Sequence, residues 1–168
     1  AEDVTQLLAQ TSNLRGVVHA AGVLDDGMLM HQSPKRFLKV AGPKVSGAWN
    51  LHIQTKDLPL DFFVLFSSVA SILGSPGQSN YAAANAFMDG LAHHRKHQGL
   101  VATSINWGPW SDVGMAASDV VLQRLMKDGW QPMNASQGCD FIGHLLKVCK
   151  LPQAAVLPVD WRQFAASI

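Results

Sequence analysis

The chain has 168 residues, of which 48% are apolar and 15% are charged, so it can bury one hydrophobic core. Thirteen basic and twelve acidic side chains give a net charge of +1, and the basic residues are scattered rather than gathered into a nucleic-acid-binding stripe. The apolar run at residues 62–66 is far shorter than the roughly 20 residues that cross a bilayer, so neither a membrane segment nor a secretory leader is expected. Cys139 and Cys149 have no partner motif, which predicts neither a disulfide framework nor a zinc site and fits a reducing cytosol.

Strand-like apolar runs alternate with helical patterns from the start of the chain, which is typical of an α/β fold with a mainly parallel sheet. Residues 2–10 are expected to be the end of a helix, and residues 16–20 a short buried strand. Ser33 is a predicted N-cap, and a proline follows it at the first helical position. It opens a helical stretch over residues 34–56, in which Pro43 predicts a kink.

Residues 61–66 are apolar on both strand faces and too short for a helix, which predicts a central parallel strand. A Gly/Ser/Pro-rich loop at residues 74–78 leads to a helix predicted over residues 79–97. Gly99 is placed to stop that helix in the position after its C-cap. Residues 101–106 are expected to form the next strand.

The remaining third of the chain is less regular. Residues 112–133 have weak periodicity and predict an irregular excursion that contains a helix, residues 135–149 a further helix, and residues 154–158 a last strand. No glycine-rich G-x-G-x-x-G fingerprint follows any predicted strand, and the sequence starts within an element. We therefore expect residues 1–168 to be the second half of a Rossmann-like, doubly wound parallel sheet whose upstream strands lie outside this chain.

A serine, a tyrosine and an asparagine form the sharpest functional pattern. Ser68 lies at the carboxyl end of the predicted central strand, which is where ligands bind in open α/β sheets. Tyr81, the single tyrosine of the chain, and Asn85 are four residues apart, so they share a face of the next helix. The alternative is structural: a serine that caps the strand end and an aromatic ring in the core.

Reduction of a ketone needs a hydride donor and an acid that protonates the developing alkoxide. Tyr81 can be this acid if a nearby cation draws its pKa down from about 10, the ordinary value for tyrosine. Lys44, in an apolar neighbourhood before the central strand, is the candidate cation. Ser68 would donate a hydrogen bond to the same carbonyl oxygen, and Asn85 would orient Lys44 or a water molecule. A solvated helix lysine is the alternative for Lys44.

Four sequence strings carry a resemblance to a known family. They are VVHAAGVLDD (residues 17–26), FSSVA (66–70), GSPGQSNYAAANAF (74–87) and NWGPW (106–110). Together they resemble the ketoreductase domain of modular polyketide synthases, in the short-chain dehydrogenase/reductase superfamily, and the match covers nearly the whole chain. In that family the lysine precedes the serine and the asparagine lies four residues after the tyrosine, as here. The resemblance implies catalytic roles for Lys44, Ser68, Tyr81 and Asn85, with Tyr81 as the proton donor.

The same resemblance implies NADPH as the cofactor and a mobile lid over the substrate channel at residues 112–133. The implied cofactor-side residues are His19, Ala20, Ala21, Gly22, Trp107, Gly108 and Pro109. From the residues themselves, the small side chains after the first strand fit close backbone approach to a ribose, with plain core packing as the alternative. The Gly-Pro step is by itself only a turn.

The family also carries a stereochemical marker. Asp26 completes the Leu-Asp-Asp motif of the class called B-type, and Leu73 replaces the tryptophan that marks the opposite class. The implied reaction converts a β-ketoacyl group, carried on the phosphopantetheine arm of an acyl carrier protein, to the D-configured β-hydroxyacyl group. The arm would enter on the Asp26 side. Neighbouring polyketide synthase domains are the implied partners. The implied location is the cytoplasm.

The sequence disfavours two rival functions and one rival site. A redox-silent or epimerising ketoreductase module is disfavoured by the intact catalytic set, and a stand-alone short-chain dehydrogenase by the exchanged lysine and asparagine. His93 and His97 are one helical turn apart and resemble a metal-binding face, but the sequence has no HExxH glutamate. A solvated basic helix end, favourable against the helix dipole, is the better interpretation, and no metal site is expected.

Overall fold

The computed structural model describes residues 2–113, 119–148 and 150–167. Its internal contacts divide the chain into two compact units. The first unit consists of residues 1–106 with 151–154, and the second of residues 107–150 with 155–168. All four residues predicted to be catalytic belong to the first unit.

The first unit alternates strands and helices, as the sequence predicted. Its elements are α1 (Glu2–Ala9), β1 (Gly16–His19), η1 (Leu29–His31), α2 (Pro34–Ala41), η2 (Gly42–Ser46), α3 (Gly47–Thr55), β2 (Phe62–Ser68), α4 (Ala70–Leu73) and α5 (Ser79–His97). The strands β3 (Thr103–Trp107) and β4 (Gln153–Val156) begin in this unit and end in the second. The predicted helix at residues 79–97 is confirmed, and Gly99 follows it with the expected positive φ of 76°.

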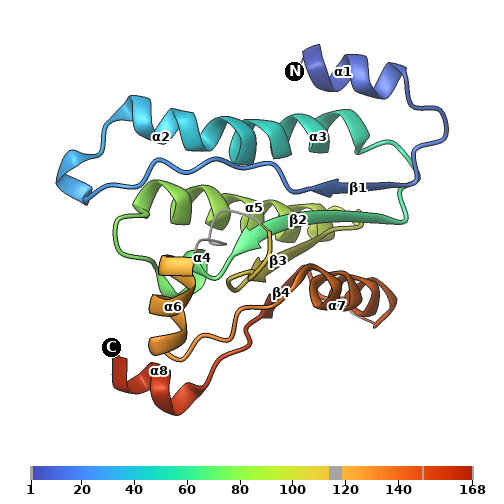
Figure 1. Cartoon of the computed structure of the whole chain (residues 1–168). Coiled ribbons are helices and arrows are strands. Elements are labelled where there is room, and N and C mark those ends of the chain that lie inside the picture. Colours follow the sequence, from blue (N-terminus) through green and yellow to red (C-terminus); the bar gives the residue numbers. More distant parts are fainter. Residues whose placement is uncertain (1, 114–118, 149, 168) are drawn as a thin grey trace. The chain divides into compact units, whose positions relative to one another are not determined.

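The four strands form one sheet in the order β1-β2-β3-β4, with helical segments between successive strands (Figure 1). β1 and β2 pair in parallel, with Gly16 opposite Phe62 and His19 opposite Leu65. Because parallel strands end at the same edge, the residues after His19 and those after Leu65 emerge side by side. The predicted α/β class with a Rossmann-like sheet is confirmed.

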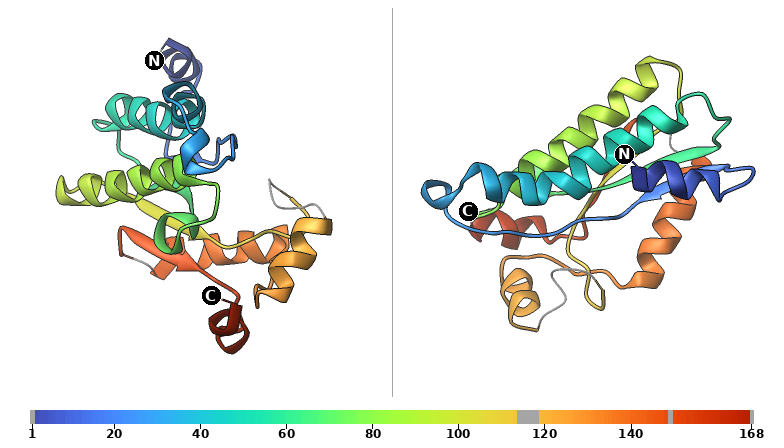
Figure 2. Two further views of the ribbon diagram at one scale, coloured as in Figure 1. Left: turned by 90° about the vertical axis from the view of Figure 1, so that its left-hand side faces the viewer. Right: turned by 90° about the horizontal axis from the view of Figure 1, so that it is seen from above.

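The kink predicted at Pro43 is a π-helical turn, η2, between α2 and α3. Proline has no N–H to donate to the preceding turn, so the widened turn avoids a broken α-helical hydrogen bond. Ser33 caps α2 as expected, since its Oγ accepts a hydrogen bond of 3.4 Å from the Arg36 backbone N–H. The segments α2 and η2 contact α5, and Figures 1 and 2 show them running alongside it. This contact brings Lys44, in η2, to the face of α5.

Most of the first unit's core lies between the sheet and its helices. The main cluster consists of Val17, Ala48, Leu60, Phe63, Leu65, Met88, Leu91, Ala92 and Ala102. A buried arginine borders it: Arg95 is 1% exposed and lies 3.9 Å above the Phe63 ring. Its guanidinium is 3.1 Å from His52 Nδ1, and only a neutral His52 accepts there. Burial lowers the pKa of His52, which keeps it neutral.

The second unit holds α6 (Asp119–Lys127), α7 (Ala135–Val148) and α8 (Trp161–Ser167). Gly138 of α7 lies directly against the Trp110 ring, where a Cβ atom would come within 2.1 Å of a ring carbon. The irregular stretch predicted over residues 112–133 contains α6, while residues 114–118 and Cys149 lie outside the described residues. The lid assignment stays a prediction. Within the described part of the chain, no helix is long and apolar enough to cross a membrane.

Candidate active site

The end of β2 and one face of α5 frame the candidate site. Ser68 is the last residue of β2 and is half-buried. Tyr81 and Asn85 lie one turn apart on α5 and are 9% and 0% exposed. Tyr81 packs in a small core cluster with Val40, Ala70 and Ala84. The structure thus brings the strand-end serine and the helix pair together, a convergence that the sequence spacing alone did not establish.

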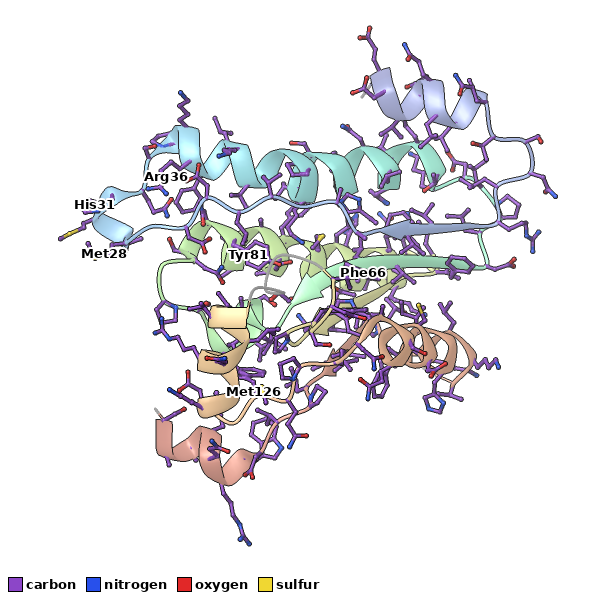
Figure 3. All side chains as sticks on the ribbon, in the orientation of Figure 1. Met28, His31, Arg36, Phe66, Tyr81 and Met126 are labelled. Carbon is purple, nitrogen blue, oxygen red and sulfur yellow. The ribbon has the colours of Figure 1, made fainter. Side chains whose placement is uncertain are left out.

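Lys44 is buried beside the same residues. Its side chain is 3% exposed, its Nζ donates a 3.0 Å hydrogen bond to the Phe66 carbonyl oxygen, and its Nζ lies 5.2 Å from the centroid of the Tyr81 ring. Figure 3 shows Tyr81 on α5 and Phe66 on β2, the two residues that Lys44 joins. The alternative of a solvated helix lysine is therefore wrong. Burial lowers the pKa of Lys44 to about 8, against an attraction from Asp89 that raises it.

The expected lowering of the Tyr81 pKa by Lys44 is not found. Burial raises the pKa of Tyr81, because desolvation disfavours the phenolate, and the nearby Asp26 adds to the rise. Hydrogen bonds with Asn85 and Ser68 act in the opposite direction. The physical reason is geometric: the Lys44 ammonium lies over the ring face and bonds to Phe66, so it does not solvate the phenolic oxygen. In this state Tyr81 is a neutral, proton-bearing acid.

Ser68 and Asn85 each keep one polar function available. Ser68 Oγ accepts a 3.2 Å hydrogen bond from the Ala70 backbone N–H, which leaves its own hydroxyl proton to donate. Asn85 Nδ2 donates to the Tyr81 backbone carbonyl at 2.8 Å, one turn back along α5. The Asn85 Oδ1 atom is buried and has no hydrogen-bond partner among the described residues. A buried acceptor of this kind fits a water molecule or an ammonium group.

The residues at the end of β1 and just after it have two kinds of surroundings, buried and exposed. His19 is buried, and its Nε2 lies 2.9 Å from the Pro43 carbonyl oxygen, so His19 carries its proton on Nε2 and fastens the π-helical turn that holds Lys44. Burial and the charge of Lys44 both lower the pKa of His19. Gly22 faces Lys44, where a Cβ atom would lie 2.9 Å from Cε. Ala20 and Ala21 are exposed, and the cofactor roles of all four residues stay predictions.

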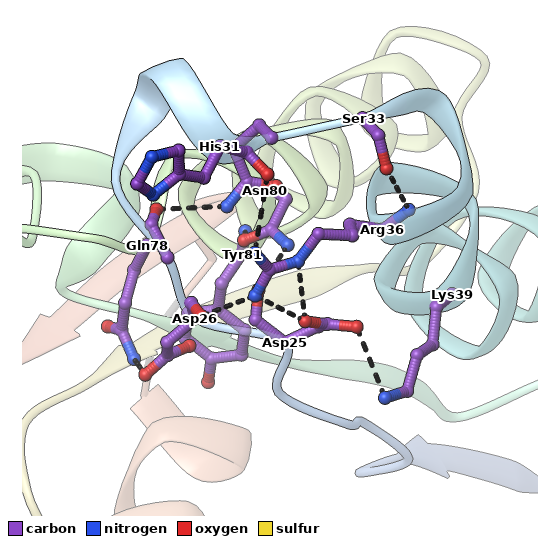
Figure 4. Close-up of polar contacts among 11 residues, drawn as sticks. Asp25, Asp26, His31, Ser33, Arg36, Lys39, Gln78, Asn80 and Tyr81 are labelled. Carbon is purple, nitrogen blue, oxygen red and sulfur yellow. Dashed lines mark hydrogen bonds and ion pairs between the residues drawn. The ribbon is translucent and has the colours of Figure 1, made fainter.

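The first aspartate of the Leu-Asp-Asp motif is an anchor. The Asp25 carboxylate accepts from Arg36 at 2.6 Å and from Lys39 at 3.2 Å, and both cations lie on α2 (Figure 4). Asn80, just before the tyrosine, donates a 2.8 Å hydrogen bond to the Asp25 carbonyl oxygen. Sequence reasoning missed Arg36 and Asn80. Arg36 lies eleven residues and Asn80 fifty-five residues from Asp25 in the sequence, so neither belongs to a short motif that could have pointed to these contacts.

The second aspartate is exposed at the site. The Asp26 carboxylate accepts a 2.9 Å hydrogen bond from Gln78 Nε2, and its charge acts on the Tyr81 pKa (Figure 4). The Asp26 side chain is thus aimed toward the tyrosine's end of α5 while Asp25 holds the loop. Leu73, at the end of α4, is 48% exposed. These placements agree with a substrate-side role for Asp26 and Leu73, which stays a prediction.

The other predicted cofactor residues belong to the second unit. The rings of Trp107 and Trp110 meet edge to face, with centroids 5.0 Å apart. The Gly108 N–H donates to the Val156 carbonyl oxygen at 3.0 Å, and the Pro109 carbonyl oxygen accepts from the Met133 N–H at 3.1 Å. This turn is therefore held on both sides by backbone hydrogen bonds. Its role toward a cofactor stays a prediction.

The histidine-rich end of α5 has other partners. His93 Nε2 lies 3.2 Å from Gln153 Oε1, and the His94 ring contacts those of Trp49 and His52. Over the described residues there is no group of three or more histidine, cysteine or acidic side chains placed to hold a metal ion.

Comparison with known proteins identifies the family and the fold. The family model described as KR domain matches residues 1–112, which carry all four candidate catalytic residues. The chain belongs to the ketoreductase domains of polyketide synthases. It is 47% identical to polyketide synthase GfsA of Streptomyces halstedii over 167 residues, which is 98% of this chain and 2% of that protein. It is 46% identical over 167 residues to the phenolphthiocerol synthesis polyketide synthase Pks15/1 of Mycobacterium bovis, covering 92% of this chain and 8% of that protein.

Solved ketoreductases have the same fold. A structure described as A-type ketoreductases from a modular polyketide synthase superposes with a TM-score of 0.93 at 39% identity, covering 99% of this chain and 36% of that chain. The first ketoreductase of the tylosin polyketide synthase superposes with a TM-score of 0.87 at 40% identity, covering 99% of this chain and 37% of that one. The chain thus spans little more than a third of the solved ketoreductases that it matches.

Proposed function

We propose that this chain is the catalytic part of a longer ketoreductase domain, which reduces a β-ketoacyl group to a β-hydroxyacyl group with NADPH. Tyr81 is the proton donor to the substrate's carbonyl oxygen, and Ser68 donates a second hydrogen bond to that oxygen. Asn85 orients Lys44 or a water molecule, and the Lys44 ammonium returns a proton to Tyr81 through that water molecule after the reaction. The cytoplasm is the proposed location, and neighbouring polyketide synthase domains are the proposed setting.

The observation that carries this proposal is the burial of Lys44 against Tyr81. Removal of an ammonium group from water costs free energy. Among the described residues Lys44 Nζ recovers one hydrogen bond, to the Phe66 carbonyl oxygen. Its Nζ is 5.2 Å from the Tyr81 ring centroid, and the side chains of Ser68 and Asn85 lie near enough to the phenol to lower its pKa against the effect of burial. A purely structural tyrosine would need no such cation. Perturbed titratable groups that gather at a strand's carboxyl end are typical of active sites.

The residues present fit one side of a nicotinamide cofactor. Ala20 and Ala21 follow β1 with small, exposed side chains, so backbone can approach a ribose closely. The chain contains no G-x-G-x-x-G turn, so the residues that bind the pyrophosphate of the cofactor would come from another part of the domain. When bound, NADPH supplies the hydride for the carbonyl carbon. The chain's own residues hold the carbonyl oxygen and supply its proton.

The proposed substrate arrives on the phosphopantetheine arm of an acyl carrier protein. Asp26 is exposed, is fixed by Gln78, and acts on the pKa of Tyr81, so it marks the side of the site that such an arm would follow. Arg36 and Lys39 hold the neighbouring Asp25, which keeps this loop in place (Figure 4).

We further propose B-type stereochemistry. Overall superposition does not separate the classes, because the structures described as A-type and C2-type give TM-scores of 0.93 and 0.88. The proposal therefore rests on local residues: Asp26 is present, and Leu73 takes the place of the opposing tryptophan.

Reduction of a β-ketoacyl thioester by the complete domain is expected to give the D-configured alcohol. The phosphopantetheine arm enters the site beside Asp26, and this direction of entry presents one face of the ketone to the hydride. Chiral chromatography of the product measures this directly, with Leu73→Trp as the comparison variant. A predominantly L product from the unmodified domain would refute the B-type assignment and leave ketoreduction standing, whereas the absence of any alcohol would refute the proposed function.

A further inference from the structure

Helix α5 continues the catalytic face by one more turn. Tyr81, Asn85 and Asp89 are spaced four residues apart, so all three side chains lie on the same side of the helix. Asp89 is 8% exposed, and among the described residues it is the one acidic side chain that is buried. The proposed mechanism gives it no task. A buried carboxylate needs several hydrogen bonds to be tolerated, so its partners show what it holds.

Asp89 accepts three side-chain hydrogen bonds. Its Oδ2 accepts from Ser71 Oγ at 2.7 Å and from Asn106 Nδ2 at 2.9 Å, and its Oδ1 accepts from Ser104 Oγ at 2.6 Å. Ser71 lies on α4, directly after β2, while Asn106 and Ser104 lie on β3. The carboxylate therefore joins α5 to the segment that follows Ser68 and to the next strand of the sheet.

Two of these partners reach the backbone of Ser68. Ser71 Oγ lies 2.8 Å from the Ser68 carbonyl oxygen, so its one hydroxyl proton is shared between this oxygen and Asp89 Oδ2. Asn106 Nδ2 lies 3.4 Å from the same carbonyl oxygen. The orientation of the Asn106 amide is fixed from the other side, because Gln153 Nε2 donates to its Oδ1 at 2.9 Å. The two hydrogens of Asn106 Nδ2 therefore point toward its nearest acceptors, Ser71 Oγ at 2.8 Å and Asp89 Oδ2 at 2.9 Å, and the Ser68 carbonyl oxygen lies farther away.

A second branch reaches Asn85. Asn106 Nδ2 lies 3.2 Å from Ser67 Oγ, and Ser67 Oγ donates to the Asn85 backbone carbonyl oxygen at 3.3 Å. Ser67, Asn85 and Asn106 are 4%, 0% and 0% exposed, so water does not replace these contacts. The network thus touches the main chain of two of the four proposed catalytic residues without touching the substrate side.

We propose that Asp89 is a positioning residue of the ketoreductase site, which fixes the backbone of Ser68 through Ser71 and Asn106. This inference rests on the proposed function, because Ser68 needs a fixed position only if it holds the reacting carbonyl. Displacement of a catalytic hydrogen-bond donor by a fraction of an ångström lowers turnover.

The charge of Asp89 has a second consequence, for Lys44. The titratable groups that face Lys44 are Tyr81 and Asp89 from α5 and His19 from β1. Asp89 is the anion among them, and its attraction raises the pKa of Lys44 against the effect of burial. Loss of this charge therefore lowers the pKa of Lys44 further. Activity that needs the ammonium form is then lost at a lower pH.

The chain offers a matched pair of variants for the test, Ser71→Ala and Ser104→Ala, made in the complete ketoreductase domain. Each removes one serine hydroxyl from the Asp89 carboxylate, but only Ser71 also contacts Ser68. We expect Ser71→Ala to lower kcat for a β-ketoacyl thioester about tenfold, and Ser104→Ala to leave kcat within about twofold, at similar losses of thermal stability. The NADPH dissociation constant is expected to be unchanged in both.

Asp89→Asn gives a readout that a purely structural role would not move. The alkaline limb of its pH–kcat profile is expected at lower pH than in the unmodified domain, while that of Ser71→Ala stays in place. Equal kcat values for the two serine variants, or an unshifted limb in a folded Asp89→Asn, would overturn the inference. Neither result would affect the proposed function, which fails instead if the unmodified domain does not reduce the thioester.

Discussion

Replacement of Tyr81 by phenylalanine in the complete domain is expected to lower kcat by about 10²- to 10⁴-fold, the usual contribution of a positioned general acid. The change removes only the hydroxyl group. The ring stays in its cluster with Val40, Ala70 and Ala84, so helix α5 and its packing are kept. Steady-state kinetics with a β-ketoacyl thioester measure the effect, and we expect it in kcat rather than in KM.

Two controls accompany this variant. The NADPH dissociation constant and the melting temperature of Tyr81→Phe are expected to match those of the unmodified domain, because the proposed cofactor residues and the core are untouched. A variant that keeps full turnover would remove Tyr81 from the mechanism. Because the chain has no second tyrosine, no other phenol in it can substitute for the missing hydroxyl.

The isolated 168-residue chain is expected to bind NADPH very weakly and to reduce ketones negligibly. Charge-assisted contacts to phosphate supply much of the binding energy of a nicotinamide cofactor. The predicted cofactor residues of this chain, at residues 19–22 and 107–109, offer mainly backbone and apolar contacts, and the chain has no glycine-rich fingerprint. Isothermal titration calorimetry on the chain alone checks this prediction.

The matched experiment adds the remainder of the ketoreductase domain as a separate polypeptide. Recovery of NADPH binding and turnover on mixing is expected, since the catalytic side chains already lie together in this chain. Micromolar binding of NADPH by the chain alone would show that residues 1–168 contain a phosphate-binding site. The proposed division of the cofactor site between this chain and the rest of the domain would then be wrong.

Much of the fold follows from local sequence signals. The apolar run before Ser68, the Ser33-Pro34 start and Gly99 each predict an element boundary that the structure confirms, because they act through strand burial, helix capping and positive φ. The short elements η1, α4 and α8 were not predicted. With three to seven residues, they have too few turns for a periodic pattern to be recognised.

The sequence predicted which residues form the site better than it predicted how their charges interact. Strand-end position puts Ser68 where ligands bind, and helix spacing puts Tyr81 and Asn85 on one face, but only the family resemblance joined them with Lys44. Spacing does not tell whether the Lys44 ammonium meets the phenolic oxygen or the ring face. The structure gives the ring face, and burial then raises the pKa of Tyr81. Asp89 was overlooked because a polar residue on an alanine-rich helix resembles a solvated one until its buried partners on β3 are known.

The most direct test of the account follows the hydride itself. NADPH that carries deuterium at both hydrogen positions of nicotinamide carbon 4 is incubated with the complete domain and a β-ketoacyl thioester, and the product is analysed by mass spectrometry and NMR. The account predicts one deuterium on the β-carbon of the hydroxyacyl product, with one NADPH oxidised for each alcohol formed. Exchange of hydrogen at the α-carbon without NADPH oxidation, as in an epimerising module, or an unchanged substrate would contradict it.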